Sequence, residues 1–240
     1  MATINQDIFF SKLFQTGMTD PNSKVYLPKI LLDTQSPSLN PYTMDRLDLG
    51  KQTIGGVEID VLLTGIVING IPNVSVRPED GGSFALTGLN AAITAQFCKL
   101  LPPPPGVTPT LALSSNFTLA YPGNQLTGTL SLLIDQAALN AQMVLSGGDQ
   151  LINIITTVMS LQALVPATAT ISPTITFDGG EGDFWATLFK KFIKKPTTIS
   201  AIVARINDEL NAQGTKDSLS SELSTIFQNA IRQQLNPQIS

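Results

Sequence analysis

The sequence predicts an α+β fold in which a long curved antiparallel β-sheet wraps around, or packs on, C-terminal helices. Two observations support this prediction. Between residues 57 and 145 apolar side chains alternate with polar ones, which is the period of strands that bury one face. In the last third of the chain apolar side chains recur instead at helical spacing. Strands followed by helices are typical of the α+β class.

The length of 240 residues fits one large domain with a substantial core. Within it we expect three parts: an N-terminal helix and irregular segment over 1–50, mainly strands over 51–180, and helices over 181–240. Residues 5–14 predict a short amphipathic helix. Residues 25–42 contain recurring prolines and predict an extended surface segment.

Turn-forming sequences divide the strand-rich part. Asn69-Gly70, residues 79–82 and residues 122–124 predict turns, and Gly65 predicts a bulge or a bend. Near residues 150–164 the apolar side chains recur at helical spacing, which predicts a helix. The expected strands cover residues 57–68, 84–99, 111–121, 126–135, 137–145 and 167–177.

Three helices are expected at the C-terminal end, over residues 183–194, 199–210 and 217–235. The apolar stripes of the last two are too short for a sustained coiled coil. We therefore expect both helices to pack on the apolar face of the sheet.

Composition excludes several classes of function. Charged residues make up only 13% of the chain and the formal net charge is −4, so we expect no nucleic-acid partner, because phosphate contacts need clustered Lys and Arg. The chain has no histidine and a single cysteine, Cys98, which removes Ser-His and Cys-His catalysis and most zinc sites. We expect no enzyme, no cofactor and no metal site; a hydrolase using carboxylates stays open, although no convergent pair of acids stands out.

Residues 184–195 predict the most amphipathic helix of the chain. Aromatic and aliphatic side chains fall on one half of this helix, and lysines fall on the other. Such a helix can pack on the core with a solvated basic face, or it can lie in a membrane interface or against a partner. The candidate residues for membrane or partner contact are Trp185, Phe189, Phe192, Lys190, Lys191, Lys194 and Lys195.

The acidic glycine-rich loop before this helix contains Asp178, Glu181 and Asp183. Carboxylates on such a loop could bind Ca²⁺, but their spacing does not match the EF-hand loop. We expect an ordinary turn, with Asp183 capping the helix.

No run of the chain reaches the roughly 18 apolar residues of a membrane span. The first residues lack the basic and apolar regions of a signal peptide. We expect synthesis in the cytoplasm, and export by a leaderless route stays open.

The order of the elements resembles the tubular lipid-binding (TULIP) superfamily, and the run Leu63-Thr-Gly-Ile-Val-Ile-Asn-Gly-Ile-Pro-Asn-Val is similar to its recurrent strand with a glycine kink. The chain lacks the disulfide and secretion signal of the animal members, so the resemblance is nearest to the accessory proteins of bacterial toxin clusters. It implies a long curved sheet around a long helix, an apolar groove between them, and no catalytic residues. The matching ranges are 57–145, 167–177, 199–212 and 217–235.

We therefore expect a non-catalytic protein that binds lipid or another hydrophobic small molecule in an apolar groove, and the resemblance adds an accessory role in a toxin or secreted complex. Three alternatives stay open: the same side chains form a dry core, the chain is a structural subunit that contacts protein partners, or it is a peripheral membrane protein. The candidate groove residues are Leu111, Leu113, Phe117, Leu119, Ile206, Leu210, Leu223 and Phe227.

Overall fold

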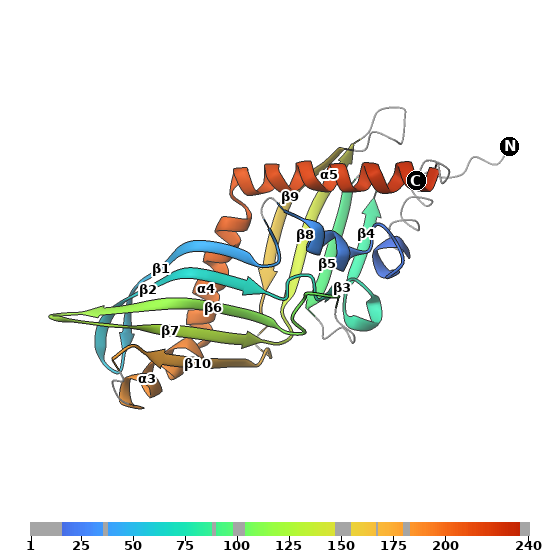
Figure 1. Ribbon diagram of the computed structural model, residues 1–240. Coiled ribbons are helices and arrows are strands. Elements are labelled where there is room, and N and C mark those ends of the chain that lie inside the picture. The colour runs from blue at the N-terminus through green and yellow to red at the C-terminus, as the bar shows by residue number, and fades with distance from the viewer. Residues whose placement is uncertain are drawn as a thin grey trace.

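Figure 1 shows the computed structural model, which describes residues 16–35, 38–87, 90–97, 104–146, 155–166, 168–179 and 183–235. Its strands form two antiparallel sheets, of order β1-β2-β6-β7-β10 and β3-β5-β8-β9, with β4 paired to β5. The predicted α+β class, with long antiparallel strands followed by C-terminal helices, is confirmed. The elements are α2 (Leu27–Asp33), β1 (Tyr42–Ile54), β2 (Val57–Asn69), β3 (Val74–Ser75), a 3-10 helix (Pro78–Asp80), β4 (Ser83–Thr87), β5 (Asn90–Phe97), β6 (Leu111–Tyr121), β7 (Asn124–Ile134), β8 (Ala138–Ser146), β9 (Ile155–Leu164), β10 (Ile171–Phe177), α3 (Asp183–Ile193), α4 (Pro196–Leu210) and α5 (Gln213–Leu235).

The chain crosses between the two sheets at residues whose backbone turns sharply. After β2, Gly70 adopts a φ of +88°, and a Cβ at this position would lie 2.5 Å from the carbonyl oxygen of Thr110. Only glycine fits such a left-handed, crowded position without strain. After β7, Gln136 has a φ of 55° and leads the chain into β8 of the other sheet. These turns divide the strands, which the sequence suggested as one long sheet, into two.

Several predicted turns and irregularities are confirmed. Residues 122–123 connect β6 and β7, which pair without interruption from Leu111↔Ile134 to Tyr121↔Asn124. Gly65 has a φ of +55°, and the pairing of β2 with β6 shifts register between Thr64 and Val67. Gly65 therefore lies at a bulge, as expected.

Two expectations for the first part of the chain are corrected. Residues 25–42 are not wholly extended, because α2 forms within them and buries Leu27, Ile30 and Leu31 at helical spacing. Its proline lies in the first turn, where the missing N–H costs no helical hydrogen bond. The strands also begin earlier than predicted, with β1 at Tyr42. The helix expected over residues 5–14 lies outside the described residues.

Two expectations for the strand-rich part are also corrected. The single strand expected over 84–99 is a hairpin, in which β4 and β5 pair up to Thr87↔Asn90. The helix expected near 150–164 is β9 over its described residues, and it pairs with β8. The helical spacing is misleading because Ile155 and Met159, which would lie on the apolar face of such a helix, are each 54% exposed. β-branched residues at 155–158 favour the strand.

The C-terminal helices agree with the prediction, and the core joins them to both sheets. One contiguous cluster of buried apolar side chains extends from Met18 to Phe227 and includes residues of every helix from α2 to α5. Within the described part of the chain, no helix combines the length and the hydropathy needed to cross a membrane.

Side chains of α4 and α5 cover the free edge of β9. Asn207 pairs with Ala163: its Oδ1 accepts the N–H of Ala163 with an N···O distance of 2.7 Å, and its Nδ2 donates to the carbonyl of Ala163. Asn211, which directly follows α4, pairs in the same way with Leu161, whose N–H donates to Oδ1 with an N···O distance of 3.0 Å. In α5 the hydroxyl of Ser220 accepts from the N–H of Val158 at 2.9 Å, and Ser224 pairs in the same way with Thr156. We call these four side chains the edge ladder.

The spacing of the edge ladder has a simple geometric cause. Four helical residues rise about 6 Å and two strand residues about 6.6 Å, so side chains at i and i+4 meet backbone groups at j and j−2. The interruption between Leu161 and Val158 coincides with the shift in register of β8 against β9. An edge strand normally offers unpaired backbone groups to other chains, and here the helices satisfy several of them.

Candidate functional site

An apolar pocket of about 140 Å³ lies where the two sheets meet, enclosed by α2, α4 and α5. Its lining comes from β1, β2, β6 and β7 of the first sheet and from β8 and β9 of the second. Its volume is close to that of an engineered cavity of about 150 Å³ that stays dry and binds benzene. The pocket therefore has room for a compact apolar group.

The helices present regular stripes to this pocket. From α4 the lining side chains include Ile199, Ile202, Ile206 and Leu210, and α5 adds residues at steps of four. Spacings of three and four place such residues on one face of a helix. The stripes predicted from the sequence thus face the junction of the two sheets. The α5 residues are Leu219, Leu223 and Phe227.

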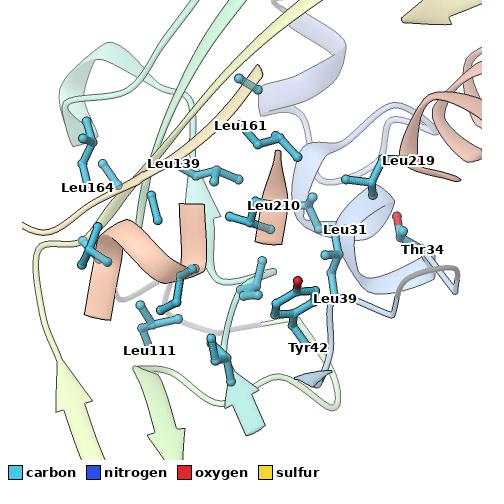
Figure 2. A pocket seen from close by; sticks show the side chains of 18 of the residues that line it. Leu31, Thr34, Leu39, Tyr42, Leu111, Leu139, Leu161, Leu164, Leu210 and Leu219 are labelled. Atoms are coloured by element: carbon cyan, nitrogen blue, oxygen red, sulfur yellow. The ribbon is translucent and has the colours of Figure 1, made fainter. Parts of the chain in front are cut away.

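The pocket is buried at one end and half-exposed at the other. Leu31 and Tyr42 are buried at the end formed by α2 and β1. Leu111 and Leu164 are partly exposed, and Figure 2 shows them on the opposite side of the pocket from Leu31 and Tyr42. On this side the apolar lining side chains therefore already meet solvent.

The structure brings six of the eight predicted groove residues together in this lining. They are Leu111, Leu113, Ile206, Leu210, Leu223 and Phe227. Phe117 and Leu119 lie further along β6 and do not line the pocket. Phe117 packs instead against Phe177 and Phe189, with ring centroids 5.1 and 4.9 Å apart. One face of β6 therefore has two roles: the first residues of the strand line the pocket, and Phe117, further along, belongs to an aromatic cluster.

The predicted contact helix, α3, uses most of its apolar face inside the protein. Phe189 and Phe192 are 0% and 3% exposed, and Trp185 is partly buried and stacks on Tyr121 with centroids 5.4 Å apart. Phe184, in contrast, is 68% exposed. The four predicted lysines, Lys190, Lys191, Lys194 and Lys195, are all exposed. The exposed surface of α3 and of the residues that connect it to α4 is thus basic, since Lys190 and Lys191 lie in α3 and Lys194 and Lys195 follow it, and Phe184 adds a large exposed apolar side chain.

Among the lining residues that the structure describes, two side chains are polar, Thr34 and Tyr42. The hydroxyl of Thr34 donates to the carbonyl of Ile30 at 2.8 Å. Burial raises the pKa of Tyr42, and the negative charge of Glu209 raises it further. The phenol therefore stays neutral at physiological pH, and no side chain of the described lining is ionised. Among the described residues, no group of three acidic or thiol side chains could hold a metal ion.

The sequence did not single out Tyr42. The sequence pattern predicts Tyr42 only as the end of an irregular segment, although Tyr42 and Met44 begin the alternation of β1 and both are buried. The period is obscured because two charged residues, Asp45 and Arg46, follow Met44 and because the pairing shifts register between Asp48 and Gly50. The available signal was an aromatic residue with a polar group at the start of an alternating run.

No family model matches the sequence, and no curated protein matches it. Among solved structures, that of lipopolysaccharide binding protein is similar: the alignment covers 96% of this chain and 39% of the lipopolysaccharide binding protein chain, at 14% identity and a TM-score of 0.42. Takeout 1 of Epiphyas postvittana aligns with 91% of this chain and 88% of its own, at 9% identity and a TM-score of 0.39. The chain thus spans well under half of lipopolysaccharide binding protein. Both TM-scores are low, so the function proposed below depends on the geometry of the pocket.

Proposed function

We propose that this protein is a non-catalytic binding protein that holds a lipid or another hydrophobic small molecule in the pocket between its two sheets. The observation that carries the proposal is the pocket's described lining, which is apolar except for two hydroxyl groups. Pockets of this composition, with few polar groups, are typical of sites for apolar ligands. Within the described residues, the lining offers no pair of titratable groups for acid–base catalysis.

The pocket's size indicates how such a ligand binds. A volume of about 140 Å³ accommodates a ring or a short chain, and a longer chain would extend through the half-exposed end or displace flexible side chains such as Met18 and Met143. Each methylene that enters the pocket gains about 0.8 kcal/mol. This gain corresponds to about a fourfold increase in affinity per methylene.

A series of 1-alkanols from butanol to decanol, measured by isothermal titration calorimetry, tests the proposal. We expect the affinity to rise about fourfold per methylene and then to level off once the pocket is filled. Ala141→Phe should abolish this binding, because Ala141 lines the pocket and a ring there would occupy it.

The matched control is Gln142→Phe, which adds the same ring at the neighbouring, exposed position of β8. This variant should bind like the parent protein. Absence of binding for every alkanol, or equal binding by both variants, would contradict the proposal.

A second candidate function is contact with an anionic membrane through α3. It is favoured by the exposed Phe184 beside Lys190, Lys191, Lys194 and Lys195, since apolar and basic side chains together suit a membrane interface. Co-sedimentation with phosphatidylserine vesicles tests it. Binding should be lost on replacing the lysines by glutamine and weakened by Phe184→Ser; equal binding by these variants would contradict it.

A structural subunit without a ligand is the remaining alternative, and the family resemblance adds an accessory role in a toxin or secreted complex. This role predicts a defined assembly with a protein partner, detectable by pull-down from the source and by light scattering. It also predicts that the alkanols do not bind, which separates it from the proposal above.

A further inference from the structure

One of the two hydroxyls in the described lining of the pocket, that of Tyr42, has no hydrogen-bond partner among the described residues. Tyr42 is only 6% exposed, and among the described residues nothing forms a hydrogen bond with its Oη. Figure 2 shows the Tyr42 ring among the lining leucines, with the hydroxyl turned toward the side where Leu31 and Leu210 lie. The hydroxyl of a buried tyrosine usually has a hydrogen-bond partner. When such a hydroxyl faces a cavity and no protein group bonds it, a molecule in the cavity is the partner to expect.

The charges around this end of the pocket are acidic. Glu209 lies on α4 next to the lining residue Leu210, close enough for its charge to act on Tyr42. From α5, the Oε1 atom of Glu222 accepts the N–H of Gln35 at 2.9 Å, beside the lining residue Thr34. No lysine or arginine is among the lining residues that the structure describes. An anionic ligand would therefore meet two carboxylates nearby and no counter-ion.

We infer that the pocket selects an uncharged amphiphile, such as a long-chain alcohol, ether or ester, whose single oxygen exchanges a hydrogen bond with Tyr42. This inference rests on the proposed function and specifies the class of ligand. An ionised carboxylate would lose its hydration without gaining a cation. An alkylammonium ion would also lose its hydration without gaining a direct ion pair, because Glu209 and Glu222 lie near the pocket but are not among its described lining residues.

Three probes of equal length at pH 7.5 test the selectivity: 1-octanol, octanoate and octylammonium, of which the last two are ionised at this pH. Calorimetry should show that 1-octanol binds at least tenfold more tightly than either ion. Toluene serves as a probe that has no oxygen. Equal affinity for 1-octanol and for one of the ions would overturn the inference.

Tyr42→Phe removes only the hydroxyl and keeps the ring that packs in the core. It should lower the affinity for 1-octanol by about three- to tenfold, the effect of one hydrogen bond, and leave toluene bound at least as tightly as in the parent protein. Glu209→Gln should raise the affinity for octanoate by about two- to fivefold, since a nearby negative charge is removed. Tyr121→Phe, at a tyrosine outside the pocket, is the matched control and should change neither affinity.

The outcomes separate the two proposals. If no probe binds, including toluene, the pocket has no ligand and both proposals fail. If toluene and 1-octanol bind but Tyr42→Phe leaves the affinity for 1-octanol unchanged, the proposed function stands and the inference about Tyr42 is wrong.

Discussion

Replacing Phe189 by alanine is expected to lower the free energy of unfolding by about 3–5 kcal/mol, the range for a large aromatic side chain removed from a packed core. Phe189 is 0% exposed and lies between the rings of Phe117 and Phe192, at centroid distances of 4.9 and 5.9 Å. The Phe117 ring itself fits because residue 128 is glycine: a Cβ added at this position would lie 2.7 Å from that ring. The cluster therefore has little freedom to close a cavity.

Chemical denaturation monitored by circular dichroism measures this effect. The matched control is Phe184→Ala on the same helix, where the side chain is 68% exposed and the expected change is within about 0.5 kcal/mol. Similar losses in both variants would contradict the arrangement of α3. The pair also matters for vesicle binding, because a variant at Phe189 changes the stability of the core, whereas one at Phe184 changes the exposed surface alone.

Removing the asparagines of the edge ladder is the second large change. Asn207→Ala together with Asn211→Ala should destabilise the protein by about 2–5 kcal/mol, because the backbone groups of Leu161 and Ala163 lose their partners in a partly buried setting. The freed edge of β9 should also favour association between copies of the chain.

Hydrogen exchange measures this second effect residue by residue. The amides of Leu161 and Ala163 should exchange faster in the double variant, while those of β6 and β7 change only with global stability. Asp208→Ala, between the two asparagines, is the control: Asp208 is exposed and its 3.7 Å contact with Arg205 contributes little. Unchanged exchange at Leu161 and Ala163 would show that the ladder does not form in solution.

Local periodicity made part of this fold predictable. The stripes of α4 and α5 and the hairpin of β6 and β7 follow from side-chain spacing and turn residues, which act over a few positions. The division into two sheets does not, because it depends on pairings between distant strands, such as β2 with β6. The helical pattern near β9 misled for a related reason: the edge ladder, supplied by residues more than 40 positions away, stabilises this strand.

The candidate site shows the same limit. Alternation places Leu111, Leu113, Phe117 and Leu119 on one face of β6. It does not show which helix packs against each part of that face. Only the fold shows that α4 and α5 enclose the pocket beside Leu111 and Leu113, while Phe117 packs on α3. Tyr42 reaches the site through β1, a strand whose period is interrupted by a bulge.

The most direct test of the central claim, that the pocket holds an apolar ligand, is a crystal structure of the protein with 8-bromo-1-octanol. We predict an anomalous bromine peak among the side chains of α4, β8 and β9 that line the pocket, with the ligand oxygen within hydrogen-bond distance of Tyr42 Oη. A pocket without ligand density at a concentration that saturates binding in solution, or bromine bound only at other surfaces, would contradict the account.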